Sequence, residues 1–520
     1  MPAETRFSGS FGASSHCLPS PDGELVATLA SSSGISIRWV RSLQLANIVK
    51  LPRDLSPPFM AFRWSPSSRR LLVASADQLH VFSALDGAFH AVIRNPLAPG
   101  VKLGFVDFGA SDAEVCMISS LGLKLSIFDL AASRTVEIAN PKFYSASTAA
   151  KAFSFRPRTR HLAVLTRTNA RDLVSVHHPQ SRDTQRSWNA ETIDASGLSW
   201  SPDSRWLVVW ESPAHGHKVL FYTPDGQLFK CWSGPQAGLD AANRDCLSLG
   251  AGVKLLQFAA DSSRMALADF GRTVYLLDVA TVVEAVRLSH PAAITPTERL
   301  EVYQQNLATS HTGERSIPAE FVKGKHQTLL PAGRPAGENA ELRTGPSLMA
   351  FDATSTFMAS VLGDWPATVW IWDVRTAGLR SALLFHANVT TLSWHPRIPS
   401  TLLIRCEGDQ HSSLAFVWDA LSTGPRTVDF LRGGLPAKSA ASCHCSWLDL
   451  KGTDAPILFY TDATSYVLAS LGGDGDGSPP WRETSEIYEE SALDLVSASL
   501  GGDESDDEPL DDTFHFRQNR

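Results

Sequence analysis

An all-β protein of the β-propeller type is predicted by two observations: a unit of about 40 residues recurs along the chain, and no helical period interrupts the strand pattern inside it. The clearest unit spans residues 195–232. Ser201–Ser204 and Thr223–Gly226 are expected to be tight turns, because Pro presets φ and the Asp and Ser side chains bond nearby backbone groups. A single unit cannot bury both of its faces, so further copies are expected.

Four short strands surround these turns. Gly197–Trp200 alternates apolar and polar residues, which predicts a half-buried strand. Trp206–Trp210 and Val219–Tyr222 are apolar runs of the length of buried strands, and Gln227–Trp232 completes the antiparallel set. Four antiparallel strands without a helix describe one propeller blade.

Nine units share this register when the residue before the first turn serves as a marker. Each marker is followed by an apolar strand and then by a second β-rich run. Most intervals between markers lie near the ~40–45 residues of a WD-type blade. The markers are Pro19, Trp64, Phe108, Phe155, Trp200, Phe258, Phe351, Trp394 and Trp447.

Three units end their third strand in Asp, and two of them carry the Trp-Asp pair that gives the WD repeat its name. These endings are Leu277-Asp278, Trp372-Asp373 and Trp418-Asp419. The sequence therefore predicts a WD-repeat β-propeller with about eight to nine blade-like units in one ring. Because propellers commonly hold 4–8 blades, two smaller or incomplete propellers are the alternative.

Three regions are expected along the chain: a disordered N-terminus at 1–13, the propeller at 14–471, and an acidic, disordered tail at 472–520. The interval between Phe258 and Phe351 is long enough to hold an insertion at about 291–346. Within it, Glu298–Asn306 and Phe321–Leu330 could each form a strand or a short helix. A loop of this length is usually functional or disordered.

The tail carries most of the net charge of the chain. Residues 472–520 hold 14 Asp/Glu and 3 Lys/Arg, whereas the whole chain has a net charge of -8, so the remaining body is close to neutral. Like charges keep such a segment solvated. Ile487–Leu500 and Phe514–Arg517 are candidate short motifs that fold on a partner.

Composition also limits the classes of function. No concentrated basic patch indicates a nucleic-acid partner, and no apolar run approaches the ~20 residues of a membrane helix. Seven scattered Cys do not form a disulfide framework, which favours a reducing compartment. Cys443-His444-Cys445 could bind a metal only with ligands from elsewhere, and a place in a blade strand is the preferred interpretation.

Motif searches assign no catalytic residue, no cofactor and no metal ligand. Phosphate-binding loops, nucleophile elbows and zinc-protease signatures are not found. The protein is therefore expected not to be an enzyme.

A structural hydrogen-bond set is expected in the eighth unit. WD blades often join a His, a Ser or Thr, an Asp and a Trp in this way. The candidates, which fall in a suitable order, are His386, Ser393, Asp409 and Trp418. Most other units lack the Gly-His start, so their stability should come mainly from apolar packing between blades.

Three stretches resemble the WD repeat-containing protein eight family. They are the unit at 197–228, the run from Ser248 to Ile294 that ends in His290-Pro-Ala-Ala-Ile294, and the run from Met349 to Asp373. The His-Pro-Ala-Ala-Ile step before the insertion is the most distinctive of them. The similarity spans about residues 14–470 and does not include the acidic tail.

This resemblance implies a non-enzymatic role at the centrosome or spindle pole body. Family members act with a coiled-coil microtubule-anchoring protein and a minus-end-directed kinesin, near the γ-tubulin complex, to hold microtubule minus ends. The expected location is the cytoplasm and cytoskeleton, without nucleic-acid or membrane partners. The alternatives are a WD-repeat scaffold or substrate receptor of another complex, in ubiquitin ligation or in chromatin or RNA assembly, and a propeller enzyme.

Overall fold

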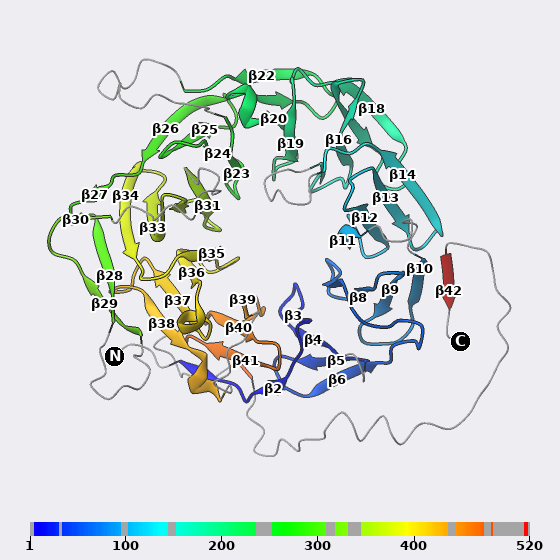
Figure 1. Cartoon of the computed structure of the whole chain (residues 1–520), viewed down its shortest axis with the longest axis horizontal. Coiled ribbons are helices and arrows are strands. Elements are labelled where there is room, and N and C mark those ends of the chain that lie inside the picture. Colours follow the sequence, from blue (N-terminus) through cyan, green and yellow to red (C-terminus); the bar gives the residue numbers. More distant parts are fainter. Residues whose placement is uncertain are drawn as a thin grey trace. The chain divides into compact units, whose positions relative to one another are not determined.

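The computed structural model describes residues 5–30, 34–94, 102–143, 152–235, 252–307, 318–330, 345–434, 443–472, 480–481 and 514–517. The chain forms two compact units, which are described separately: unit 1 is Met1–Ala139 with Phe430–Arg520, and unit 2 is Asn140–Asp429. In the described ranges the regular elements are strands and three short 3-10 turns (Figure 1). No helix in these ranges has the length and apolar character needed to cross a membrane.

Unit 1 contains three blades made of consecutive antiparallel strands. They are β3 (Cys17–Pro19), β4 (Leu25–Ala30), β5 (Gly34–Trp39) and β6 (Leu45–Val49); β7 (Ala61–Trp64), β8 (Arg70–Ala74), β9 (Gln78–Ser83) and β10 (His90–Arg94); and β11 (Leu103–Phe108), β12 (Glu114–Ser119), β13 (Lys124–Asp129) and β14 (Arg134–Ala139).

The fourth blade of unit 1 combines both ends of the chain. Its C-terminal strands are β39 (His444–Leu448), β40 (Ile457–Thr461) and β41 (Ser465–Ser470), and β1 (Arg6–Phe7) and β2 (Phe11–Gly12) pair with β41. The Ser8 N–H donates to the Leu468 carbonyl at 2.9 Å, and the Leu468 N–H donates to Ser8 Oγ at 2.9 Å. The prediction that residues 1–13 are disordered is therefore wrong for this segment, because it supplies the outer strand that β39–β41 lack.

Unit 2 contains five blades. They are β15 (Phe153–Phe155), β16 (Leu162–Thr168), β17 (Arg171–His177) and β18 (Thr184–Asn189); β19 (Ala195–Trp200), β20 (Leu207–Glu211), β21 (Val219–Tyr222) and β22 (Leu228–Trp232); β23 (Leu255–Phe258), β24 (Arg264–Ala268), β25 (Thr273–Asp278) and β26 (Val283–Ser289); β31 (Pro346–Phe351), β32 (Phe357–Leu362), β33 (Trp365–Asp373) and β34 (Gly378–Leu384); and β35 (Val389–Trp394), β36 (Thr401–Cys406), β37 (Leu414–Asp419) and β38 (Arg426–Asp429).

The described ranges thus hold nine blades, four in unit 1 and five in unit 2. This confirms the prediction of an all-β propeller with about eight to nine blade-like units. All nine markers lie in the first strand of a blade, as the repeat register requires. Cys445 is a buried residue of strand β39, in agreement with the strand interpretation of Cys443-His444-Cys445.

The marker turns are closed by their own side chains. The hydroxyls of Ser20, Ser65 and Ser201 each accept a backbone N–H from five residues later at 3.0 Å. This bond ties the turn to the start of the second strand. The recurring turn chemistry of the sequence therefore has one recurring geometry.

The fourth residue of the turn also connects successive blades, in a contact that we call the turn-serine link. Its hydroxyl accepts a backbone N–H from the turn of the preceding blade, while its own φ lies near +60°. A side chain there strains the backbone and is held only when its surroundings fix it. The described links are Asp22 N to Ser68 Oγ (3.1 Å), Arg158 N to Ser204 Oγ (3.2 Å), Asp203 N to Ser262 Oγ (2.9 Å) and Asp261 N to Ser355 Oγ (3.3 Å).

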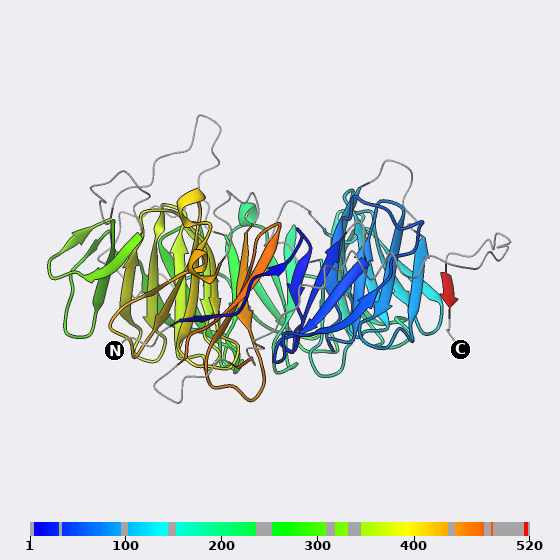
Figure 2. The same ribbon diagram turned by 90° about the horizontal axis from the view of Figure 1, so that it is seen from below.

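The insertion at about 291–346 forms strands rather than helices in its described parts. Strand β28 (Glu301–Leu307) pairs in parallel with β34, and β29 (Pro318–Lys323) pairs with β28 (Figure 1 and Figure 2). Strands β27 (Ala293–Ile294) and β30 (Thr328–Leu329) form a second pair. Residues 308–317 and 331–344 lie outside the described residues.

Side chains of the insertion enter the core of unit 2. Val302 is 0% exposed and Tyr303 is 1% exposed. The Phe321 ring lies 5.4 Å from the Phe385 ring and 5.7 Å from the Phe416 ring, in edge-on contacts. The described strands β28 and β29 of the insertion therefore extend the blade β31–β34.

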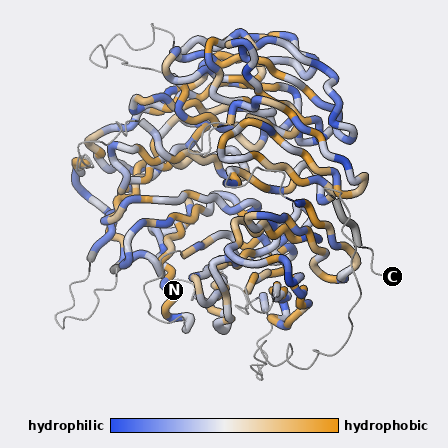
Figure 3. The backbone as a smooth tube through the Cα atoms, turned by 45° about the vertical axis from the view of Figure 1, so that its right-hand side comes forward, coloured by the Kyte–Doolittle hydropathy of each residue, from blue (hydrophilic) through white to orange (hydrophobic). Residues whose placement is uncertain are grey.

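Apolar side chains fill the space between neighbouring blades within each unit. In unit 2, one cluster joins Phe221 and Trp232 of one blade to Met265 and Leu277 of the next. Hydrophobic residues, orange in Figure 3, recur along the strands of both units. Burial of this apolar area is the main favourable contribution to folding.

We expect Ser262→Ala to lower the free energy of unfolding by about 1–2 kcal/mol, because the Asp203 N–H loses its acceptor. Ser262→Gly should cost less than Ser262→Ala, since glycine adopts φ near +60° without strain. Urea denaturation of both variants measures the difference. Ser422→Ala, in an exposed turn of the same unit, is the control and should change stability by less than about 0.5 kcal/mol. Equal costs for the alanine and glycine variants would contradict the assigned strain.

Candidate functional site

The main polar cluster of unit 2 lies where the connections between blades meet the turns between second and third strands. Because neighbouring strands run antiparallel, these two kinds of connection lie at the same end of each sheet. We call this end of unit 2 the loop face. Its charged residues bridge one blade to the next.

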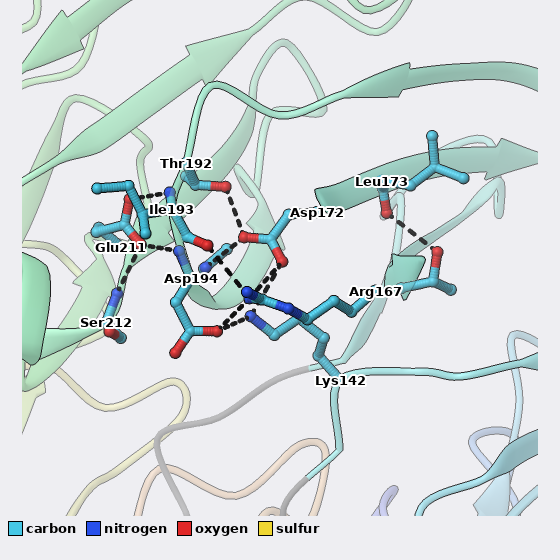
Figure 4. A network of polar contacts seen from close by, with 11 residues as sticks. Lys142, Arg167, Asp172, Leu173, Thr192, Ile193, Asp194, Glu211 and Ser212 are labelled. Atoms are coloured by element: carbon cyan, nitrogen blue, oxygen red, sulfur yellow. Dashed lines mark hydrogen bonds and ion pairs between the residues drawn. The ribbon is translucent and has the colours of Figure 1, made fainter. Parts of the chain in front are cut away.

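Lys142 and Asp172 are the centre of the first bridge (Figure 4). The Lys142 ammonium lies 3.1 Å from Asp172 Oδ1 and 2.6 Å from Asp194 Oδ1, and its side chain is 3% exposed. Arg167 Nη1 lies 3.3 Å from Asp172 Oδ1 and 2.6 Å from Asp194 Oδ1. Two cations therefore share two carboxylates, Asp172 of strand β17 and Asp194 of the connection that leads to the next blade.

Further hydrogen bonds reach the carboxylates of Asp172 and Glu211 (Figure 4). Asp172 Oδ2 accepts the Thr192 hydroxyl at 2.8 Å and the Ala195 N–H at 2.6 Å. The Glu211 carboxylate accepts the N–H groups of Ile193 and Asp194 at 2.8 and 2.6 Å. The carboxylates thus hold residues 192–195 in place.

The energetics of this cluster indicate a structural role. Burial raises the pKa of the Asp194 carboxyl, but the hydrogen bond and charge of Lys142, with the charge of Arg167, outweigh it and hold the pKa below its ordinary value. The Asp172 side chain is 0% exposed. A buried charge that loses its partner is strongly destabilising, so each member depends on the others.

A second bridge joins the next two blades. His217 Nε2 lies 3.2 Å from Asp269 Oδ2, and the Tyr275 hydroxyl donates to the same oxygen at 3.3 Å. Burial, together with the negative charge of Asp269, raises the pKa of Tyr275. The Tyr275 hydroxyl therefore remains a proton donor to this carboxylate.

A third bridge connects the blade of β23–β26 with that of β31–β34. Arg272 Nε donates to Asp364 Oδ2 at 3.1 Å, and its guanidinium lies over the Trp365 ring, 4.1 Å from the ring centroid. His290 Nδ1 lies 2.8 Å from the Arg272 carbonyl, and His290 Nε2 lies 2.8 Å from Ser360 Oγ. Trp372 Nε1–H donates to Ser360 Oγ at 3.1 Å.

These distances determine the proton positions around His290. Nδ1 must carry hydrogen, because the Arg272 carbonyl can only accept. Nε2 of the neutral ring then accepts the Ser360 hydroxyl proton, and Ser360 Oγ in turn accepts Trp372 N–H. Burial lowers the pKa of His290 to about 4 despite the hydrogen bond to the Arg272 carbonyl, so the ring is neutral near pH 7.

The four residues proposed as a structural set occupy other places in the last blade of unit 2. His386 Nε2 lies 2.8 Å from the Gln305 carbonyl, and the His386 N–H donates to Gln305 Oε1 at 3.0 Å, so His386 bonds to the inserted strand β28. Ser393 lies on β35, the first strand of its blade, and Asp409 begins the 3-10 turn η2 (Asp409–His411). Trp418 packs among Trp394 and Phe357.

His290, Ser360 and Trp372 form a described set of His–Ser–Trp bonds. The Trp372-Asp373 pair signalled the blade, but 70 residues separate His290 from Ser360 because the insertion lies between them. Because of that separation, a comparison of repeats of about 45 residues could not find this set. The Lys142 cluster was not recognised in the sequence either, because its members come from different repeats of the chain. No group of three or more metal-binding side chains is present in the described parts of the chain.

No protein-family model matches the chain. An uncharacterized WD repeat-containing protein of Schizosaccharomyces pombe, C32H8.09, is 21% identical over 90% of this chain and 92% of its own length. The mouse WD repeat-containing protein WRAP73 is 24% identical over 77% of this chain and 84% of its own length. Over most of its length the chain is similar to these WD repeat-containing proteins. These relatives confirm the predicted resemblance to the WD repeat-containing protein eight family.

A solved structure supports the same fold. The crystal structure of a eukaryotic initiation factor matches 82% of this chain and 90% of its own chain, with a TM-score of 0.50 and 12% identity. At that identity the similarity concerns the fold alone. Within this fold, the bridges of the loop face place buried charges between neighbouring blades, where they stabilise the packing.

We expect Lys142→Ala to lower the free energy of unfolding by about 3–5 kcal/mol, because it leaves the buried Asp172 without its closest cation. Lys124→Ala is the matched control: Lys124 pairs with Glu137, but both side chains are largely exposed, at 58% and 44%. Its cost should be about 1 kcal/mol or less. Thermal and urea unfolding measure both variants, and similar costs would contradict a buried network.

We expect His290 to make the fold acid-sensitive. Its pKa is lowered to about 4 in the folded protein, whereas an unfolded histidine titrates near 6.5. Its contribution is therefore fully present above pH 6.5 and is lost as the pH falls towards 4, by on the order of 3 kcal/mol. His290→Gln should be less stable at pH 7.5 but show a smaller loss between pH 6.5 and 4.5. Identical pH slopes for both proteins in urea titrations would exclude this role.

Proposed function

We propose that this WD-repeat protein is a non-enzymatic scaffold at the spindle pole body or centrosome. In this role it acts with a coiled-coil anchoring protein and a minus-end-directed kinesin to anchor microtubule minus ends, near the γ-tubulin complex. The observation that carries the proposal is the family resemblance of residues 14–470, of which the His-Pro-Ala-Ala-Ile step at 290–294 is the most distinctive part.

The chemistry of unit 2 favours a binding platform over a reactive site. The buried carboxylates Asp172 and Asp269 bond to cations, hydroxyls and backbone N–H groups of neighbouring blades. A scaffold needs a surface that keeps its shape, and these bridges supply it. Different faces of a rigid β-propeller can then bind a coiled coil and a motor at the same time.

The inserted strands offer an apolar surface for such a partner. Val322 is 54% exposed and Leu329 is 75% exposed, although β28, next to them in the fold, is firmly paired with β34. Amphipathic helices of coiled coils bind apolar side chains presented on ordered structure. We therefore propose that the coiled-coil partner binds at the strands β29 and β30.

Contact with microtubules through partners also fits the charge of the protein. Outside residues 472–520 the chain is close to neutral. A direct binder of the acidic microtubule wall would benefit from a basic patch.

The first test is to image the protein beside a spindle-pole marker in dividing cells of its own organism. A fluorescent tag should be joined to the N-terminus through a long Gly/Ser linker, because Arg6–Phe7 pair with strand β41. We expect foci at the poles that disappear when the coiled-coil partner is deleted. Diffuse signal throughout mitosis would contradict the proposal, and co-purified cullin adaptors or histones would favour the ligase or assembly alternatives.

The second part of the test uses matched variants. Val322→Asp combined with Leu329→Asp should reduce co-purification of the coiled-coil partner at least tenfold without changing the unfolding midpoint. Leu421→Asp is the control, since Leu421 is 96% exposed in a turn of unit 2 and should leave co-purification unchanged. Unchanged binding by the double variant would exclude the inserted strands as the contact.

A further inference from the structure

The C-terminal end of the chain forms a fifth strand on a blade of unit 1. Strand β42 (Phe514–Arg517) pairs antiparallel with β10, the outermost strand of the blade β7–β10 (Figure 1). The register joins His90 to Arg517, Ala91 to Phe516, Val92 to His515 and Ile93 to Phe514. The blade therefore binds a segment that lies more than 400 residues later in the sequence.

The edge of β10 is suited to accept a strand. The four residues of β10 that pair with β42, His90–Ile93, include no Lys, Arg, Asp or Glu. Natural sheets commonly protect their edges with charged residues, and several other outer strands here carry them, although β6 does not and β10 itself has Arg94 beyond the paired residues. Examples of charged residues on the other outer strands are Arg134 and Glu137 on β14, Arg186 on β18, and Lys230 on β22.

The side chains of β10 pack against its own blade and the next blade. Ala91 and Ile93 are 0% exposed and belong to an apolar cluster that extends to the next blade. His90 Nε2 lies 3.0 Å from His80 Nδ1, and the His90 ring stacks on Phe82 with 4.7 Å between centroids. The strand is thus held rigid by its own blade, so its outer edge is ready to pair without rearrangement.

The segment that precedes β42 is attached to unit 1 at both ends. Trp481 is 3% exposed and packs with Phe11 and Tyr466 of the fourth blade. Between Trp481 and Phe514 lie 32 residues with 12 Asp or Glu and one Arg. Such a length can extend to about 110 Å, so reach does not limit the pairing.

We propose that the outer edge of β10 is a strand-docking site, and that its ligand is the chain's own C-terminal segment Phe514–Arg517, bound in cis. Backbone pairing of this kind gives affinity without a deep pocket. Covalent attachment raises the effective concentration of the segment to the millimolar range, so that even weak pairing persists. The docked strand covers the edge of the sheet at His90–Ile93.

The proposal is tested with a fluorescein-labelled peptide of residues 513–520 and two versions of the protein. The chain that lacks residues 514–520 should bind the peptide saturably, whereas the full chain should bind it at least tenfold more weakly, because its own segment fills the site. A peptide with His515→Pro and Phe516→Pro should not bind, since two adjacent prolines remove an N–H needed for pairing. The same double substitution in the full chain should open the site without shortening the protein.

Hydrogen exchange gives the second measurement. The amides of His90–Arg94 should lose protection at least tenfold on deletion, while those of Leu45–Val49, on the outer strand β6, should not change. Failure of the truncated chain to bind the peptide, or unchanged exchange at β10, would overturn the proposal. A dimer seen by sedimentation and abolished by the deletion would overturn the cis assignment and place the strand on a second copy.

Discussion

The turn-serine link is the contact that sets the spacing of the blades it joins. One hydroxyl, at a residue with φ near +60°, accepts a backbone N–H from the turn of the preceding blade. The contact fixes the offset between successive sheets at one end, and apolar clusters then fill the space between them. A turn that closes one blade therefore also positions the next. The turn that begins at the marker, such as Trp-Ser-Pro-Asp-Ser at 200–204 and Trp-Ser-Pro-Ser-Ser at 64–68, is therefore a recurring signal in the chain.

Local chemistry made the blades predictable from sequence, and non-local pairing did not. Each blade is a meander whose turns, alternation and apolar runs are written within about 45 residues, so its register could be found. The pairing of Arg6–Phe7 with β41, of β28 with β34 and of Phe514–Arg517 with β10 joins segments that are distant in sequence. Such short strands carry no recognisable alternation of apolar and polar residues. Whether they form strands is determined by the strands with which they pair.

The polar sites follow the same division. His290, Ser360 and Trp372 form a bonded set that an insertion separates in sequence, so the repeat pattern did not reveal it. The Lys142 cluster draws its members from two blades, so no single repeat contains its pattern. Charges that look unremarkable in sequence become buried and mutually dependent once the sheets are packed. The polar contacts of the loop face therefore form only when neighbouring blades pack together.

The pairing of Ser8 with Leu468 has a consequence for synthesis of the protein. A ribosome makes the first strand early, but its partner strand follows 460 residues later. At 5–20 residues per second, the N-terminal segment waits about 20–90 s before β41 emerges. During that time the earlier blades can form from local contacts, while the first strand has no sheet to join. Completion of the last blade of unit 1 is thus timed by translation, and a chain that stalls before residue 470 keeps an exposed N-terminal strand for chaperones to recognise.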